Sequence, residues 1–227
     1  MDIRNYWHEI RESFALTLKS TSRMSSSTAC TIFNKPIRPY ILFEGLPGAG
    51  KTTCVTRIVE SHEDISSVDD VCNPCLYSAH YEIDWAWVLM AECMKSQLAQ
   101  RASGIGLVER GYVSLLAFHM ADDILRGTNV CREIAARLVE SFKIGFFVPP
   151  AATVIFDIEP SLSIKRRVNT RMHEWSDPKR LSLMQRFFRS YAEAPLFEDD
   201  IRFIDAGINT SDNLVTVMDI IDAAKRN

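Results

Sequence analysis

The stretch that decides the fold is YILFEGLPGAGKTT, residues 40–53. Its apolar start predicts a buried strand over 40–44, and from Gly45 to Thr52 the residues fit the pattern G-x-x-x-x-G-K-[ST] without a gap. Glycines at 45, 48 and 50 allow a tight turn whose backbone N–H groups point inward. A helix starting at Lys51 would add the positive end of its dipole. Strand, loop and helix together predict a phosphate-binding loop, or P-loop.

The residues of this loop have distinct expected roles. The backbone N–H groups would cradle the phosphates of ATP, and the Lys51 ammonium would reach the β- and γ-phosphates. The Thr52 hydroxyl would ligate magnesium, the cation that accompanies ATP. A glycine-rich turn that matches by chance is the alternative, and the strand-loop-helix setting argues against it. The expected nucleotide-binding residues are Gly45, Pro47, Gly48, Ala49, Gly50, Lys51, Thr52 and Thr53.

Beyond the loop, short apolar runs alternate with longer stretches of helical periodicity. This alternation is typical of a parallel sheet with crossover helices, so the expected fold class is α/β. Five strands are expected, over residues 40–44, 67–72, 105–109, 153–157 and 202–205. Helices are expected to begin near residues 51, 84, 113, 131, 161, 178 and 212. The carboxyl ends of parallel strands share one edge, where open α/β folds bind ligands.

An acid and a base end the strand expected over 105–109. The apolar run is followed by Glu109 and then Arg110, which resembles a Walker B strand. A carboxylate there could hold magnesium and its water shell, or accept a proton from an acceptor. The guanidinium of Arg110 would stabilise a transferring phosphoryl group. The alternative is an ordinary surface ion pair.

A basic segment at roughly 165–181 is a candidate lid. Residues 164–171 read IKRRVNTR, and more basic residues follow. Arg167 and Arg171 are four residues apart and would share one helical face. A lid that closes over ATP would exclude water and supply arginines to the transition state, for which Arg166, Arg167 and Arg171 are the candidates. A solvated basic helix is the alternative.

These motifs together resemble the thymidylate kinase and deoxynucleoside kinase branch of the P-loop kinases. Phe43-Glu44-Gly45 looks like the strand-to-loop signature of that branch, and residues 109–112, ERGY, are similar to its acid-arginine element. Residues 156–160, FDIEP, followed by Arg166 resemble its strand, proline and lid arginine, and 204–206, IDA, its last strand. The resemblance implies a three-layer P-loop NTPase fold with a five-stranded parallel sheet, helices on both faces, a closing basic lid and ATP as phosphoryl donor.

The sequence departs from this branch on the acceptor side. The second strand of these kinases usually ends in Glu-Pro, whereas residues 71–74 read VCNP. Thymidylate kinases place an arginine on the next helix to grip the acceptor's phosphate, but residues 85–94 contain no Arg or Lys. The group that accepts the phosphoryl, a hydroxyl or a phosphate, is therefore left open.

A hydroxyl acceptor would need a base, because an alcohol is a poor nucleophile at neutral pH. Glu109 is the first candidate for this role, with Asp69 and Asp70 as reserves that could equally be turn residues. Aromatic residues that could stack on a planar acceptor, or simply form a core wall, are Tyr81, Trp85 and Trp87.

The N-terminal residues 1–36 are expected to form an amphipathic helix and a Ser-rich linker, ahead of a P-loop kinase domain over 37–227. The apolar residues of the helix recur at helical spacing: Ile3, Trp7, Ile10, Phe14 and Leu18. This pattern is compatible with a helix docked on the main domain or with a contact to a partner, including a homodimer.

Composition indicates which partners and which cellular location to expect. The 227 residues carry 26 basic and 29 acidic side chains, a net charge of −3, so no bulk field attracts a nucleic-acid polymer or an anionic membrane. No apolar run approaches the roughly 18 residues of a spanning helix, and we expect a cytoplasmic protein. The cysteines are expected to be reduced thiols: Cys30, Cys54, Cys72, Cys75, Cys93 and Cys131. Cys72 and Cys75 have the spacing of half a zinc site, but no second pair follows.

Three hypotheses follow for the function. The first is an ATP-dependent kinase of a small metabolite, with a nucleoside or nucleotide as the expected acceptor. The second is a kinase of another small molecule, such as an antibiotic or a biosynthetic intermediate. The third is a non-catalytic, nucleotide-dependent regulatory protein that engages a partner through its N-terminal helix.

Overall fold

The computed structural model describes residues 2–21, 38–68, 85–167, 176–197, 200–207 and 210–226, with the side chains of 16–21, 87 and 210–212 outside the description. The strands are β1 (Tyr40–Gly45), β2 (Ile65–Val68), β3 (Ile105–Glu109), β4 (Ala152–Asp157) and β5 (Asp200–Asp205). The helices are α1 (Ile3–Thr21), α3 (Lys51–Ser61), α4 (Trp85–Ala99), α5 (Tyr112–Arg126), α6 (Val130–Lys143), α7 (Pro160–Lys165), α8 (Pro178–Glu193) and α9 (Thr210–Arg226).

The strands form one parallel sheet in the order β2-β3-β1-β4-β5. Strand β1 is central and every residue in it is buried, as expected for a strand covered on both faces. The phosphate-binding loop therefore leaves the middle of the sheet, with β3 on one side and β4 on the other. The predicted α/β class with a five-stranded parallel sheet is confirmed.

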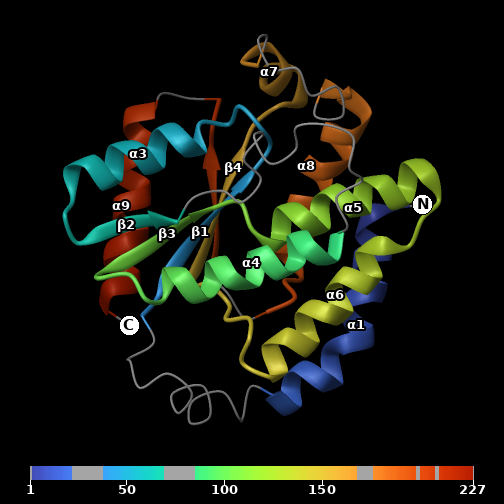
Figure 1. The fold of residues 1–227 in the computed structure, drawn as a ribbon. Helices are drawn as coiled ribbons and strands as arrows, with labels where there is room; N and C mark the ends of the chain where they lie inside the picture. The colour runs from blue at the N-terminus through green and yellow to red at the C-terminus, as the bar shows by residue number, and fades with distance from the viewer. Residues whose placement is uncertain are drawn as a thin grey trace.

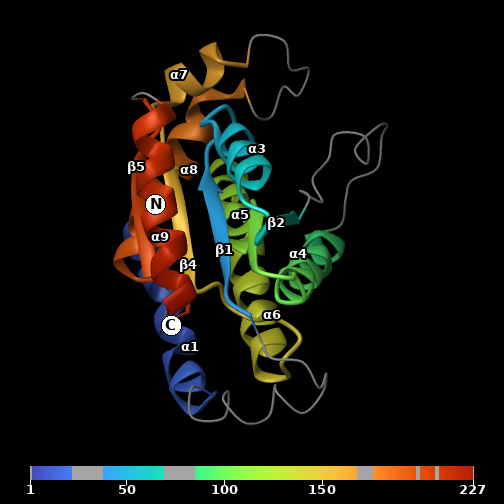
Figure 2. The same cartoon turned by 90° about the vertical axis from the view of Figure 1, so that its left-hand side faces the viewer.

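Helices cover both faces of the sheet. Helices α3 and α9 lie on one face, and α4, α5 and α8 lie on the other, where α1 and α6 add an outer layer (Figures 1 and 2). Short right-handed crossovers are the standard connections between parallel strands, and they distribute the helices between the two faces. No helix in the described part of the chain is both long enough and apolar enough to span a membrane.

Two strands begin two residues earlier than expected, namely β2 and, at Asp200 rather than residue 202, β5. Strand β2 begins at Ile65, not at residue 67, because Ile65 pairs with Ile105 of β3 and buries its side chain. The remainder of the expected strand, residues 69–72, lies outside the described residues.

Helix α1 packs against α6 and α8 (Figure 1), and the periodic apolar residues Ile3, Trp7 and Ile10 are buried in the core. Trp7 is fully buried, and its indole N–H donates to the carbonyl of Ala194 at 2.8 Å. Its ring lies 5.1 Å from that of Phe187 and 5.5 Å from that of Tyr191, measured between centroids. The helix therefore contributes to the main core. The proposed division at residue 36 stays a prediction, because residues 22–37 are outside the description.

Three cysteines are described, and each is a buried free thiol. Burial raises the pKa of Cys54 and of Cys93 to about 11, so both stay protonated and unreactive at neutral pH. The other cysteines, among them the Cys72–Cys75 pair considered as half a zinc site, lie outside the described residues.

Candidate active site

The glycine-rich segment forms a tight loop between β1 and α3, and two of its glycines are required by the geometry. Gly45 has φ +125°, and a Cβ there would lie 2.4 Å from the carbonyl oxygen of Phe156 on β4. Gly50 has φ +92° and immediately precedes the first turn of α3. L-residues rarely adopt such φ values, so only glycine allows the chain to turn here. In this loop Ala49 is buried, while Thr53 is exposed on α3.

Lys51 folds across the loop that it follows. Its ammonium donates to the carbonyls of Gly45 at 2.9 Å and Leu46 at 3.0 Å, and the residue is only 3% exposed. Burying an ammonium is costly unless it is hydrogen-bonded, and these carbonyls supply the acceptors. The charge is thus held at the mouth of the loop, where phosphate groups would compete for it.

Thr52 and Glu109 lie side by side. The parallel register pairs Phe43 of β1 with Glu109 at the end of β3, so the carboxylate comes alongside the loop. The Thr52 hydroxyl donates to Glu109 Oε1 at 2.8 Å. Hard oxygen donors of this kind suit magnesium, which usually takes few protein ligands and keeps waters and phosphate oxygens. The described residues contain no cluster of three or more His, Cys, Asp or Glu that could hold a metal ion.

Two arginines converge above the loop. Burial and, after it, the neighbouring guanidinium of Arg110 lower the pKa of Arg167. A Cβ added at Gly48 would lie 3.1 Å from Cγ of Arg167, so this side chain lies directly against the loop. Arg166 donates to the carbonyl of Ala206 at 2.9 Å and to that of Gly48, in the loop, at 3.5 Å. Like charges gathered beside backbone N–H groups favour binding of an anion.

The predicted lid is described in part. Helix α7 is tied to the phosphate-binding loop, since the Ser163 hydroxyl donates to the carbonyl of Pro47 at 2.6 Å. Arg166 and Arg167 form the turn that follows this helix. Arg171 and the remainder of residues 168–175 lie outside the described residues, so the assignment of Arg171 stays a prediction.

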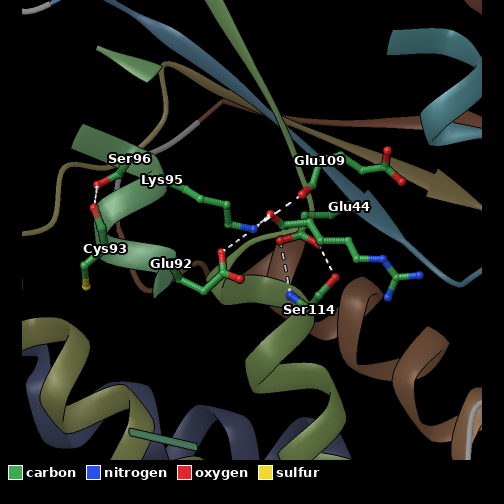
Figure 3. A network of polar contacts seen from close by, with 8 residues as sticks. Glu44, Glu92, Cys93, Lys95, Ser96, Glu109 and Ser114 are labelled. Carbon is green, nitrogen blue, oxygen red and sulfur yellow. Dashed lines mark hydrogen bonds and ion pairs between the residues drawn. The ribbon is translucent and has the colours of Figure 1, made fainter. Parts of the chain in front are cut away.

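A buried polar network behind the site was not predicted (Figure 3). The carboxylate of Glu44 is fully buried and accepts hydrogen bonds from the backbone N–H and the hydroxyl of Ser114. Burial raises the pKa of Glu44, while these hydrogen bonds and then the ammonium groups of Lys51 and Lys95 oppose the rise. In the sequence, this network is indicated only by Glu44, an acid at the end of an otherwise apolar strand. Glu44 entered the sequence analysis only through the family resemblance of Phe43-Glu44-Gly45.

The acceptor side is described only in part. Trp85 is half-buried and packs against the core. Tyr81, Asp69, Asp70 and the side chain of Trp87 lie outside the described residues, as does the stretch 71–74 that departs from the family pattern. Their suggested roles in binding or deprotonating an acceptor stay predictions.

No protein-family model matches this sequence, and no curated protein matches it either. Solved structures do match, among them deoxyadenosine kinase from M. mycoides with bound dATP, at 13% identity and a TM-score of 0.62. The same enzyme with the products dCMP and dCDP matches at 11% identity and 0.62, and with dCTP at 11% and 0.57. Each alignment covers 81% of this chain and 99% of the other. At these identities the likeness concerns the fold, and the chain has the fold of a deoxynucleoside kinase-like P-loop kinase.

Proposed function

We propose that this protein is a kinase that transfers the γ-phosphoryl group of ATP to a nucleoside or nucleotide. The observation that carries the proposal is the convergence of five groups on one loop. The Lys51 ammonium lies at its mouth, the Thr52 and Glu109 oxygens are 2.8 Å apart at its end, and the guanidinium of Arg110 lies close to that of Arg167. A phosphate-binding turn with a purely structural role would need none of these.

Each group has a task in phosphoryl transfer. The loop N–H groups and Lys51 bind the β- and γ-phosphates, and Arg110 and Arg167 neutralise charge on the transferring group. Thr52 and Glu109 would hold magnesium, which would supply positive charge to offset the charge that develops on the phosphates. The hydrogen bond from Thr52 favours this metal role for Glu109 over the role of a base. A loose transition state asks little of a base, so alignment and charge neutralisation supply most of the rate.

The acceptor class rests on two observations of different kinds. The matching structures are of a deoxyadenosine kinase and contain dATP, dCTP or deoxycytidine products, which supports a deoxynucleoside here. The missing Glu-Pro at residues 71–74 favours the second candidate, a kinase of another small metabolite such as an antibiotic or a biosynthetic intermediate. A cytoplasmic location and a homodimer remain further predictions.

One experiment separates these functions. The purified protein is incubated with ATP, magnesium and a panel of deoxynucleosides, ribonucleosides, their monophosphates and other metabolites, and new phosphorylated masses are sought. Turnover of a nucleoside or nucleotide supports the first function, and turnover of another metabolite supports the second. Tight ATP binding without any turnover would indicate the regulatory alternative.

The matched variants are Lys51→Met and Lys143→Met. Both remove a lysine charge and keep an unbranched side chain, but Lys143 is exposed at the end of α6. We expect turnover to fall at least about 100-fold in Lys51→Met, since an interaction made in the transition state is lost. Lys143→Met should behave as wild type. Full turnover in Lys51→Met contradicts the proposed role of the loop.

A further inference from the structure

Lys95 is a charged residue inside the protein. It lies on α4, its side chain is 2% exposed, and its ammonium is 2.8 Å from Glu92 Oε2 one turn earlier (Figure 3). The same ammonium donates to the carbonyl of Arg110 at 2.7 Å and lies 3.4 Å from that of Glu109. One ammonium thus links α4 to the end of β3, where the candidate catalytic residues begin.

Stability alone does not account for this arrangement. Removing two ions from water costs several kcal/mol for each, and replacing a buried ion pair by apolar side chains of similar volume is often neutral or stabilising. An apolar residue at position 95 could fill the space. It could not donate hydrogen bonds to main-chain carbonyls, and that is what the ammonium of Lys95 does.

The carbonyl that Lys95 contacts belongs to a strained residue. Arg110 has φ +55°, and no other non-glycine residue in the described part of the chain has a positive φ. Such a conformation costs about 1–3 kcal/mol and persists only where its surroundings impose it. Two contacts do so here: the N–H of Arg110 donates to the carbonyl of Phe43 at 2.9 Å, and its carbonyl accepts from Lys95.

We propose that Lys95 is a positioning residue, which locks the turn at Glu109 and Arg110 so that the carboxylate meets Thr52 and the guanidinium meets the phosphates. Glu92 balances the charge that this lock requires. The inference rests on the proposed function, because it assigns Lys95 to the same site. If Lys95 has this role, loss of its contact between α4 and the end of β3 should lower the rate of phosphoryl transfer more than the affinity for ATP.

The test replaces the buried pair in the double variant Glu92→Met, Lys95→Met, which removes both charges and roughly keeps the volume. We expect its melting temperature to stay near that of wild type, because no unpaired charge is left behind. Its kcat should fall about 10- to 100-fold, since small displacements of catalytic groups have costs of this size. The KM for ATP should change less than about threefold, because the loop itself is untouched.

Gln97→Met is the matched control. Gln97 lies on the same helix and also donates to main-chain carbonyls, those of Gly145 and Phe146, but at a place away from the site. Its kcat should equal that of wild type. A folded double variant with unchanged kcat overturns the proposal, and so does an equal loss in the control.

Two further measurements cover the remaining outcomes. If the double variant does not fold, Glu92→Gln, Lys95→Met is used, which also removes both charges and the donor to the carbonyl of Arg110. A tenfold loss of kcat in this variant supports the proposal, and kcat near wild type overturns it. If the wild type phosphorylates no acceptor, the proposed function fails. The crystal structure of the double variant then decides on Lys95, because φ of Arg110 leaving the left-handed region supports the lock, and φ near +55° overturns it.

Discussion

The strained turn at Arg110 allows the backbone and the side chain of one residue to be tested separately. Replacing Arg110 by glycine removes the guanidinium and also relieves the strain of φ +55°. The left-handed conformation costs a non-glycine residue about 1–2 kcal/mol, and glycine loses about 0.5–1 kcal/mol through the entropy of the unfolded chain. Arg110→Ala removes the same guanidinium but keeps the strain. From the midpoints of these ranges, Arg110→Gly should be more stable than Arg110→Ala by about 0.75 kcal/mol.

Activity should respond differently from stability. Both variants lack the guanidinium, and an arginine that stabilises phosphoryl transfer is worth about 10³-fold or more in kcat. Both should therefore lose activity to the same extent, although one is more stable than the other. Unfolding in urea followed by circular dichroism measures the first quantity, and turnover of the acceptor found above measures the second.

Arg137 supplies the control for the backbone effect. It is exposed in the middle of α6, where glycine is about 1 kcal/mol less favourable than alanine. Arg137→Gly should thus be less stable than Arg137→Ala, the reverse of the order at position 110. If Arg110→Ala proves as stable as Arg110→Gly, the strain argument is wrong. If either Arg110 variant retains full turnover, its guanidinium does not serve the reaction.

Three other predictions follow from single contacts. Thr52→Ala should raise the magnesium concentration needed for half-maximal rate about tenfold while Thr52→Ser keeps it, because serine retains the hydroxyl; equal magnesium curves would remove Thr52 from the metal site. Trp7→Ala should lower the free energy of unfolding by about 3–5 kcal/mol, because a fully buried indole is lost. A urea titration measures this loss, and a loss under about 1 kcal/mol would mean that α1 is not docked on the domain. Glu44→Gln should be more stable than wild type by a margin that grows with pH. Burial raises the pKa of Glu44, so its contribution is present below its ordinary pKa of 4.5 and is lost as the pH rises through the folded value. Urea titrations between about pH 5 and about pH 8 check this, and a margin independent of pH would count against a buried, proton-binding Glu44.

The parts of the fold that local sequence determines could be predicted. The loop from Gly45 to Thr52 is a contiguous pattern, and its strand and helix need no distant partner to be recognised. The five strands and most helix starts follow from apolar runs and periodicity over ten to fifteen residues. Strand β2 was placed two residues late because its start depends on pairing between Ile65 and Ile105, a contact across 40 positions of the chain.

The buried network could not be predicted from the same patterns. Lys95 follows an apolar stretch on α4, and nothing nearby in the sequence shows that its ammonium meets the carbonyl of Arg110. That contact depends on the packing of a helix against the end of a strand. The strained φ of Arg110 is equally hidden, because arginine has no preference for that conformation. Sequence patterns thus identified the groups that face the loop, and missed the groups that hold them in place.

Glu44 connects the buried polar network to the phosphate-binding loop, because its carboxyl group interacts with the ammonium of Lys51. An ionised carboxylate behind the loop would satisfy part of the charge of Lys51 and so compete with phosphate for the ammonium. Burial raises the pKa of Glu44 and so weakens this competition, while the hydrogen bonds from Ser114 and the ammonium groups of Lys51 and Lys95 oppose the rise. The ammonium of Lys51 donates to the carbonyls of Gly45 and Leu46, which are neutral acceptors that phosphate oxygens could replace. A net charge of −3 is for the same reason no obstacle to binding a triphosphate, because the field that matters is set within a few ångströms of the loop.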